Sequence, residues 1–285
     1  MILGVDRIQL AVASRHAAAE RWTRLLGAEP VQEDRVAALA AHRTVLRAGT
    51  SEIELLQPDG LGATAQFVSR SRTSIFALGL AVADLARVRA HLDATAIHHV
   101  LEGNQLFVTG EWLGIPGLRL VLSQAEERKP AGLLSHIYEA THLARGYRRS
   151  VDRLVKVFDV DGANFVPIRS EQYGYEGALT LFDPDRLDRI ETVTPNAPDK
   201  TMGRYLQRRG PGFYMFYAEA PDLVAIRERL LEHAPQQWTG SRDEASPDNL
   251  FIHPQALENA MLGVSRESFA WTWSGHPERV RPPNA

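Results

Sequence analysis

Hydrophobic and polar residues alternate in residues 5–12 (VDRIQLAV), a pattern typical of a strand that is buried on one face. The next segment, SRHAAAERWTRLLGAEP, places Trp22, Leu25 and Leu26 at helical spacing, and Gly27 is a suitable stop. The segments TVLRAG and SEIELLQP then predict two short strands around a turn. The predicted order is therefore one strand, one helix and several strands.

The same order recurs three more times along the chain. The second copy begins with IFALGLAV, continues with a helix through ARVRAHLDAT, and closes with NQLFVTG and GLRLVLSQ. The third begins with SHIYEAT, followed by the helix YRRSVDRLVKVFDV and the strands GALTLF and DRIETVTP. The fourth begins with GFYMFYAEAPDL, followed by the helix VAIRERLLEHA and the segments DNLFIHP and AMLGVSRE. We expect the later Trp-rich segment WTWSG to form a terminal strand or cap.

Two sequence matches between copies support an internal repeat. AVADL (81–85) and AEAPDL (218–223) both place Asp-Leu where a helix begins, and Asp is a good N-cap residue. EIELLQP (52–58) and RIETVTP (189–195) share Ile-Glu and a closing Pro. The charged segment QAEERKPAG (124–132) is typical of an interdomain linker. The sequence thus predicts an α+β fold of four βαβββ modules, paired into domains 1–125 and 131–275.

Composition narrows the range of functions. The 285 residues are 44% hydrophobic and 24% charged, with a net charge of −3, so the chain lacks the basic excess of a nucleic-acid-binding protein. No apolar run is long enough to predict a membrane span, and the start, MILGVDRIQLAV, does not resemble a signal peptide. Cysteine is absent, which excludes thiolate metal sites and is compatible with a cytoplasmic protein. The Gly-rich signatures of nucleotide sites and the G-x-S-x-G elbow are also absent, so we expect no nucleotide cofactor.

Four strand-helix-strands units in two pairs resemble the vicinal oxygen chelate superfamily, which includes glyoxalases, bleomycin-resistance proteins and extradiol dioxygenases. The resemblance covers roughly residues 3–123 and 133–274 and includes the closing segment NLFIHPQALENAMLGVS. It implies that each pair of units curls a sheet around a cavity. It also implies that metal ligands lie on the first strand of a unit, usually His, and on its last strand, usually Glu.

Counting back from the end of each first strand gives the residues at the first-strand positions, and the last strand of each unit gives the second set. The first-strand positions are Arg7, Ala77, His136 and Met215, and the last-strand positions are Glu54, Arg119, Glu191 and Gly263. In the first pair of units, a fixed guanidinium repels a dication, so we expect no metal there. Arg7, Glu54 and Arg119 are instead predicted to form a buried ion cluster, with an anion site as the alternative.

In the second pair of units, His136 and Glu191 are the candidate catalytic residues and metal ligands. The resemblance implies a divalent metal such as Fe, Mn, Zn or Ni. The alternative is a His–Glu hydrogen bond without metal, in which the carboxylate raises the basicity of the imidazole. We predict that their polar atoms lie within about 5 Å of each other. Further candidates lie nearby in the sequence pattern: Tyr138 for catalysis, and Met215, Tyr217, Glu219 and His253 for substrate binding, with His253 also a candidate third ligand.

Two functions stay open at this point. The first is an enzyme acting on a small oxygenated organic substrate, by resemblance a lyase, isomerase or ring-cleaving dioxygenase. The second is a metal-free protein that binds a drug or metabolite, as bleomycin-resistance proteins do, and a degenerate scaffold is a third interpretation. The predicted partner is a small molecule, without nucleic acid or membrane, and a homodimer is left open.

Overall fold

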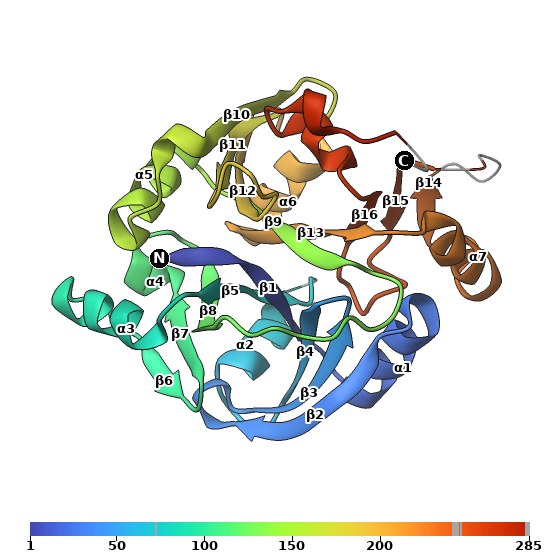
Figure 1. Ribbon diagram of the computed structural model, residues 1–285. Helices are drawn as coiled ribbons and strands as arrows, with labels where there is room; N and C mark the ends of the chain where they lie inside the picture. The colour runs from blue at the N-terminus through green and yellow to red at the C-terminus, as the bar shows by residue number, and fades with distance from the viewer. Residues whose placement is uncertain (72, 241–244, 246, 283–285) are drawn as a thin grey trace. The chain divides into compact units, whose positions relative to one another are not determined.

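The fold is described from a computed structural model, which describes residues 1–71, 73–240, 245 and 247–282. Sixteen strands in the described residues form two sheets of eight strands each (Figure 1). The order is β2-β3-β4-β1-β5-β8-β7-β6 in the first sheet and β10-β11-β12-β9-β13-β16-β15-β14 in the second. The two orders are the same when the strands of one sheet are renumbered, so the predicted repeat is confirmed in the topology.

The elements of the first half alternate as the sequence pattern predicts. In chain order they are β1 (Ile2–Ala11), α1 (Arg15–Leu26), β2 (Glu29–Val36), β3 (Ala41–Ala48), β4 (Ser51–Pro58), α2 (Ala63–Arg70), β5 (Ile75–Val82), α3 (Leu85–Ala94), β6 (Val100–Glu102), β7 (Gln105–Thr109), α4 (Gly110–Leu113) and β8 (Arg119–Gln124).

The elements of the second half repeat this series. They are β9 (His136–Leu143), α5 (Tyr147–Phe158), β10 (Phe165–Ser170), β11 (Tyr175–Leu181), β12 (Arg189–Pro195), α6 (Thr201–Arg209), β13 (Gly212–Ala220), α7 (Leu223–His233), β14 (Trp238–Gly240), β15 (Asn249–Ile252) and β16 (Leu262–Arg266).

Local signals explain where the helices begin and end. Ser14 accepts a hydrogen bond from the Ala17 amide at the start of α1, and Asp84 and Asp222 cap α3 and α7 in the same way. Gly27 ends α1 in the left-handed conformation that glycine adopts without strain. The residues predicted to form the buried stripe of α1, including Trp22, are buried. The predicted α+β class is therefore confirmed.

Some elements were not visible in the hydrophobic pattern. Strand β2 is almost entirely exposed and polar, so it carries no apolar alternation, and α2 and α6 lie in segments that the repeat pattern does not cover. The segment around Trp271 and Trp273 forms a 3₁₀ helix (Phe269–Trp273) rather than a strand. The prediction of a terminal strand is therefore wrong. The alternative prediction, a cap, agrees with the burial of Trp271.

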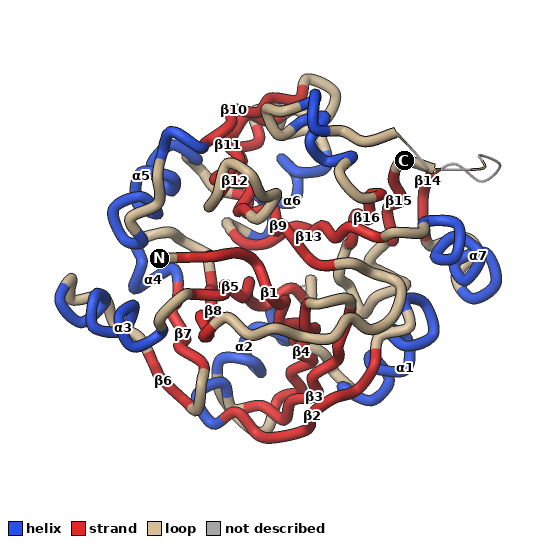
Figure 2. The backbone as a smooth tube through the Cα atoms, in the orientation of Figure 1, coloured by secondary structure: helices blue, strands red, loops and turns tan. Residues whose placement is uncertain are grey.

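The chain divides into two compact units, each built from three segments. Unit 1 comprises Met1–Val5, Ala77–Glu126 and Glu139–Tyr214, and unit 2 comprises Asp6–Phe76, Glu127–Tyr138 and Met215–Ala285. Within unit 2, α1 and α7 lie side by side, and Arg229 donates hydrogen bonds to two carbonyls at the end of α1 (Figure 2). The predicted domains 1–125 and 131–275 each supply the strands of one sheet, and their independence as folding domains stays a prediction.

The segment predicted to be a linker is held against unit 2. The amide of Gly49, at the turn between β3 and β4, donates to the Ala131 carbonyl at 2.6 Å. A Cβ at Gly49 would lie 2.1 Å from the Ser135 carbonyl oxygen, and φ is +63° there, so only glycine allows this close approach. The segment is thus part of a packed structure.

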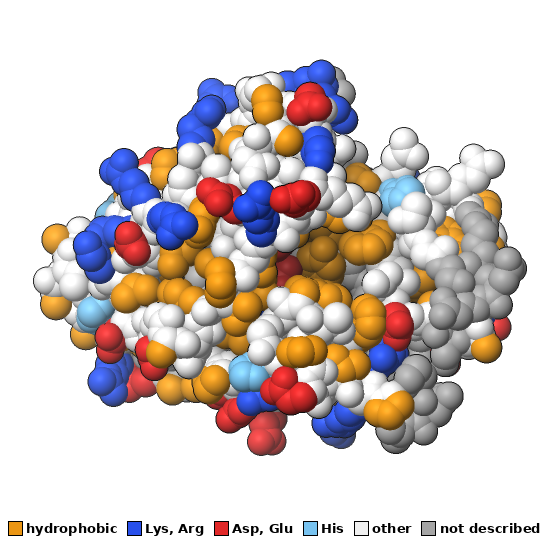
Figure 3. Space-filling view, turned by 90° about the horizontal axis from the view of Figure 1, so that it is seen from above, with side chains coloured by type: hydrophobic (Ala, Val, Ile, Leu, Met, Phe, Trp, Pro, Cys, Tyr) orange, Lys and Arg blue, Asp and Glu red, His pale blue; other side chains and the backbone are white. Residues whose placement is uncertain are grey.

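The surface matches the balanced composition. On the face seen in Figure 3, basic and acidic side chains are interspersed with apolar ones. Within the part of the chain that the structure describes, no helix is long and apolar enough to cross a membrane.

Candidate functional site

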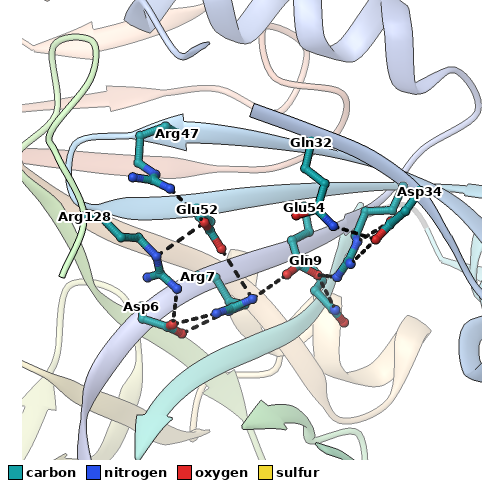
Figure 4. Close-up of polar contacts among 10 residues, drawn as sticks. Asp6, Arg7, Gln9, Gln32, Asp34, Arg47, Glu52, Glu54 and Arg128 are labelled. Atoms are coloured by element: carbon teal, nitrogen blue, oxygen red, sulfur yellow. Dashed lines mark hydrogen bonds and ion pairs between the residues drawn. The ribbon is translucent and has the colours of Figure 1, made fainter. Parts of the chain in front are cut away.

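The first copy carries a network of buried ion pairs in unit 2 (Figure 4). At its centre, Arg7 Nη1 lies 2.7 Å from Glu54 Oε1, and Arg7 Nη2 lies 2.8 Å from Asp6 Oδ2. Arg43 Nη1 approaches the other oxygen of Glu54 at 3.2 Å, and the Gln9 amide donates to that same oxygen at 2.7 Å. The predicted Arg7–Glu54 pair is confirmed, and both side chains are buried.

Further charges surround this centre and balance it. The network joins four arginines and four carboxylates: Arg7, Arg43, Arg47 and Arg128 with Asp6, Asp34, Glu52 and Glu54. Burial alone would raise the pKa of Glu54, but Arg7 and Arg43 lower it to about 2. Glu54 is therefore ionised at neutral pH, and we expect no proton transfer by the network near this pH.

Arg119 has a different partner from the predicted one. It lies at the start of β8 in unit 1, where burial lowers its pKa and the carboxylate of Glu111 opposes that shift. In unit 2, Arg43 acts on Glu54 together with Arg7. The prediction was right about the type of cluster and wrong about its third member.

Arg128 is a member of the network that the sequence did not reveal. It lies in the predicted linker, yet only 5% of its side chain is exposed. Its Nη2 lies 3.0 Å from Asp6 Oδ2 and its Nε 3.3 Å from Glu52 Oε1. The signal in the sequence was a single arginine in a charged stretch, which is more often solvated.

The third copy carries a second buried group of charges, in unit 1. Arg189 on β12 donates from Nε to Glu139 Oε2 on β9 at 2.5 Å, and both side chains are buried. Glu191, two residues further along β12, hydrogen-bonds to the carboxyl group of Glu139 and accepts a hydrogen bond from the Thr141 hydroxyl. The predicted site residue Glu191 therefore lies beside a second carboxyl group.

Glu139, rather than His136, occupies the position in copy three that Arg7 occupies in copy one. Arg7 pairs with Glu52 across β1 and β4, and Glu139 pairs with Arg189 across β9 and β12 in the equivalent register. Counting seven residues back from the N-cap of the following helix also gives Arg7 from Ser14 and Glu139 from Gly146. The alignment based on strand ends was therefore shifted by three residues in this copy.

The two carboxyl groups of copy three share one compensating cation. Burial raises the pKa of both Glu139 and Glu191. Arg189 opposes this effect most strongly at Glu139. The neighbouring carboxylate of Glu139 raises the pKa of Glu191 further, to about 8. Among the described residues, Arg189 is the cation that acts on both. Glu191 thus holds its proton at neutral pH, unlike Glu54, and the two acids behave as a coupled pair.

Aromatic and apolar side chains lie around this acid pair. Tyr175 on β11 is half-buried, and burial together with the charges of Glu191 and Glu139 raises its pKa. It packs with Tyr205 and Tyr214 against a buried cluster that includes Leu143 and Val193. Apolar surroundings of this kind strengthen electrostatic effects on a protonated carboxyl group.

His136 and Glu219 form a separate pair in unit 2. His136 Nε2 lies 3.9 Å from Glu219 Oε2, and 30% of the His136 side chain is exposed. The other oxygen of Glu219 accepts a hydrogen bond from the Ser268 amide at 2.7 Å. The predicted site residues His136 and Glu219 thus lie together, whereas the described partners of Glu191 are Glu139, Thr141 and Arg189. A direct pairing of His136 with Glu191 stays a prediction.

The remaining predicted residues of this site include an aromatic series. Tyr138 and Tyr217 have ring centroids 6.2 Å apart, and Tyr217 lies edge-on to Phe251 at the same distance. A Cβ at Gly263 would lie 2.4 Å from the Tyr217 ring, so this ring fills the space above the predicted last-strand ligand position. Met215 is buried.

His253 lies just past β15, in a turn. Its Nε2 is 3.4 Å from Thr239 Oγ1, and the histidine is partly exposed. Its proposed part as a third ligand stays a prediction.

The donor set does not fit a metal centre with three protein ligands. Within the described residues, no group of three or more His, Asp or Glu side chains is arranged to hold an ion. At the acid pair, the guanidinium of Arg189 lies where it would repel a dication. In unit 2, the ring of Tyr217 fills the ligand position above Gly263. The side chains at these two sites therefore do not suit a divalent metal.

His142, on the first strand of copy three, has a structural role. His142 is buried, and its Nε2 lies 3.1 Å from the Pro116 carbonyl oxygen, so this nitrogen carries the proton. Burial lowers its pKa to about 4. His142 is thus a neutral residue of the core.

Comparisons with known proteins agree with the fold. A mutant of 4-hydroxymandelate synthase from Streptomyces coelicolor is 15% identical, with 93% of each chain covered and a TM-score of 0.70. A TIM barrel/4-hydroxyphenylpyruvate dioxygenase fusion protein is 14% identical, with 93% of this chain and 49% of that chain covered and a TM-score of 0.60. A sequence search found no match among curated proteins.

A family model adds a match at the level of sequence. Residues 6–105, which hold the first copy and most of the second, match the model described as Glyoxalase/Bleomycin resistance protein/Dioxygenase superfamily. The resemblance inferred from the repeats thus agrees with the family model over residues 6–105, and the solved structures agree with it at the level of the fold.

Proposed function

We propose that the chain is an enzyme that moves a proton on a small oxygenated organic substrate, with Glu191 as the general acid and base. The observation that carries this proposal is the buried Glu139–Glu191 pair, in which two carboxyl groups share the charge of Arg189. A carboxyl group with a pKa of about 8 is poised to give and take protons near neutral pH. Perturbed acids of this kind are concentrated at functional sites.

The neighbouring residues have distinct parts in this proposal. In this proposal Arg189, which donates a hydrogen bond to Glu139 and opposes the rise of its pKa on burial, favours the shared proton on Glu191. The Thr141 hydroxyl donates a hydrogen bond to Glu191 and holds its carboxyl group in place. Tyr175 supplies a half-buried hydroxyl that stays protonated and can donate to a substrate oxygen. The reaction class is that of an isomerase, epimerase or lyase step that begins with a proton transfer at carbon.

His136, Tyr138, Tyr217 and Glu219 keep their predicted parts in substrate binding or catalysis within unit 2. His136 is partly exposed and its imidazole faces a carboxylate that Ser268 fixes. Such a carboxylate orients an imidazole and raises its basicity. The cytoplasmic location and the small-molecule partner belong to this proposal as well.

Proton exchange with solvent tests the proposal without knowledge of the overall reaction. The protein is incubated in D₂O with short-chain 2-oxo acids, 2-hydroxy ketones and acyl thioesters, and loss of the signal of the proton next to the carbonyl is followed by NMR. We expect accelerated exchange for at least one class, and a loss of about 10²–10⁴-fold in Glu191→Gln. The matched control is Glu176→Gln, an exposed glutamate on the adjacent strand β11. Equal exchange rates in the parent and in Glu191→Gln would contradict the role of Glu191.

A metal-free binding protein is the second candidate. The observation that favours it is the aromatic series Tyr138, Tyr217 and Phe251, which offers flat apolar surfaces in unit 2. Retention of an aromatic ligand without any proton exchange, and its loss in Tyr217→Ala, would support this function over the enzyme.

A further inference from the structure

A cavity of about 460 Å³ lies between α4 and α5 in unit 1, away from the residues discussed above. It is lined by Glu111, Trp112, Gly114, Arg149, Asp152, Arg153 and Lys156. Its volume is in the range of small-molecule pockets. The three cations follow one another at positions i, i+4 and i+7 of α5, so they lie on one side of the helix.

These cations differ in their partners from several other arginines of the protein. Arg7, Arg43, Arg128, Arg189 and Arg266 each contact a carboxylate. For Arg149 and Lys156 the described residues provide no ion pair, and both side chains are exposed. Residues 145–156 hold five basic residues and one acid in a chain with a net charge of −3. Basic side chains gather on the left of Figure 3, the side where α5 lies in Figure 1.

Arg153 is held in a fixed orientation at the centre of this group. Its Nε donates to the Leu113 carbonyl oxygen at 2.6 Å, which leaves the two terminal nitrogens of the guanidinium for another acceptor. Gly114 has a left-handed conformation, and a Cβ there would lie 3.6 Å from Arg153 Nε. The backbone after α4 therefore fixes a fork of donors that faces the cavity residues.

The two acids in the lining do not neutralise the cations. Glu111 hydrogen-bonds with Thr109 and also interacts with the charge of Arg119, which lowers its pKa. Asp152 forms no ion pair with a described residue. Arg149 also lies in the first turn of α5, where the helix dipole disfavours a cation. The three cations of the lining therefore exceed its two acids by one charge.

We propose that this cavity binds a small molecule with at least two negative charges, held by Arg149, Arg153 and Lys156. Arginine binds phosphate and carboxylate groups with two parallel hydrogen bonds, and lysine adds a point charge. Trp112 gives the cavity one apolar wall. This site is independent of the proton-transfer function proposed for Glu191.

Calorimetric titration of the full chain at constant ionic strength tests the proposal, with pyrophosphate and citrate as two separate probes. We expect saturable binding of at least one probe with a dissociation constant below about 1 mM. The double variant Arg149→Gln/Lys156→Gln is expected to weaken binding at least about tenfold. The probe that binds more tightly identifies the anion as a phosphate or a carboxylate.

The matched control is Arg148→Gln, which removes the same charge from the same helix. The Arg148 guanidinium lies over the Tyr147 ring, 5.1 Å from its centroid, and is not part of the cavity lining. Binding in this variant should stay within about twofold of the parent. The proposal is overturned if neither probe binds saturably, if the double variant binds as the parent does, or if Arg148→Gln weakens binding as much as the double variant.

Discussion

Copies one and three place buried charges at equivalent positions with opposite polarity. In copy one the arginine, Arg7, lies on the first strand and its acids, Glu52 and Glu54, lie on the last. In copy three the acid, Glu139, lies on the first strand and its arginine, Arg189, lies on the last. The surroundings then differ in balance, since four arginines meet four carboxylates in copy one, whereas Glu139 and Glu191 share Arg189 in copy three.

This difference in balance sets the protonation state of two glutamates in equivalent positions. Glu54 and Glu191 are both buried on the last strand of their copy. Glu54 lies opposite Gln9, and Glu191 lies opposite Thr141. Two guanidinium groups lower the pKa of Glu54 to about 2, while burial and a neighbouring carboxylate raise that of Glu191 to about 8. The fold therefore tolerates the same side chain as a fixed charge or as a proton donor, depending on the number of nearby cations.

The largest expected effect is on stability in copy one. Glu54→Gln removes the fully buried charge that faces both Arg7 and Arg43, so four guanidinium groups are left with three carboxylates in the network. We expect a loss of about 3–5 kcal/mol in the free energy of unfolding at pH 7, measured by urea denaturation. The matched variant is Glu191→Gln, which replaces a protonated acid by a neutral amide of the same shape. Equal losses in the two variants would contradict the proposed difference between the copies.

The fold was predictable from the sequence because alternation and helix caps act locally. Ser14, Asp84 and Asp222 mark the starts of helices, and the apolar alternation marks most strands. The Arg7–Glu54 pair was also predictable, since both residues lie near the middle of regular paired strands. The resemblance to this superfamily was inferred from these repeats.

The acid pair of copy three was not predictable in the same way. Its first strand continues to Leu143 and its helix starts after Gly146, which has no side chain to mark a cap, so counting from Thr141 led to His136 instead of Glu139. The partnership of Arg128 depends on how a linker folds back onto unit 2, which no local pattern encodes. The pKa of Glu191 depends on a balance of charges in three dimensions.

A smaller effect is expected at the edge of the network in copy one. Arg128→Gln removes the contacts with Asp6 and Glu52, but Arg7 and Arg47 still face these acids. We expect a loss of about 1–3 kcal/mol in the free energy of unfolding. The control is Lys129→Gln, because Lys129 is exposed and contributes only its carbonyl oxygen to Arg47. If the two variants are equally stable, Arg128 does not anchor the segment.

The expected effect that distinguishes the copies most directly is the change of stability with pH in Glu191→Gln. Because the pKa of Glu191 is raised from 4.5 to about 8 in the folded protein, the stability that its protonation confers is complete below about pH 4.5. This contribution decreases as the pH rises and is lost above about pH 8.

At pH 5 we expect the variant to lie within about 1 kcal/mol of the parent, since the amide replaces a neutral acid. The difference between variant and parent should then shift in favour of the variant up to pH 8.5, as measured by urea denaturation at several pH values. Using this difference removes the contributions of groups common to both proteins, such as His142, whose lowered pKa reduces stability as the pH falls from about 6.5 to about 4. Glu176→Gln, at an exposed site on β11, should run parallel to the parent throughout. If Glu191→Gln also runs parallel to the parent, Glu191 is ionised at neutral pH like Glu54, and the proposed acid–base role loses its basis.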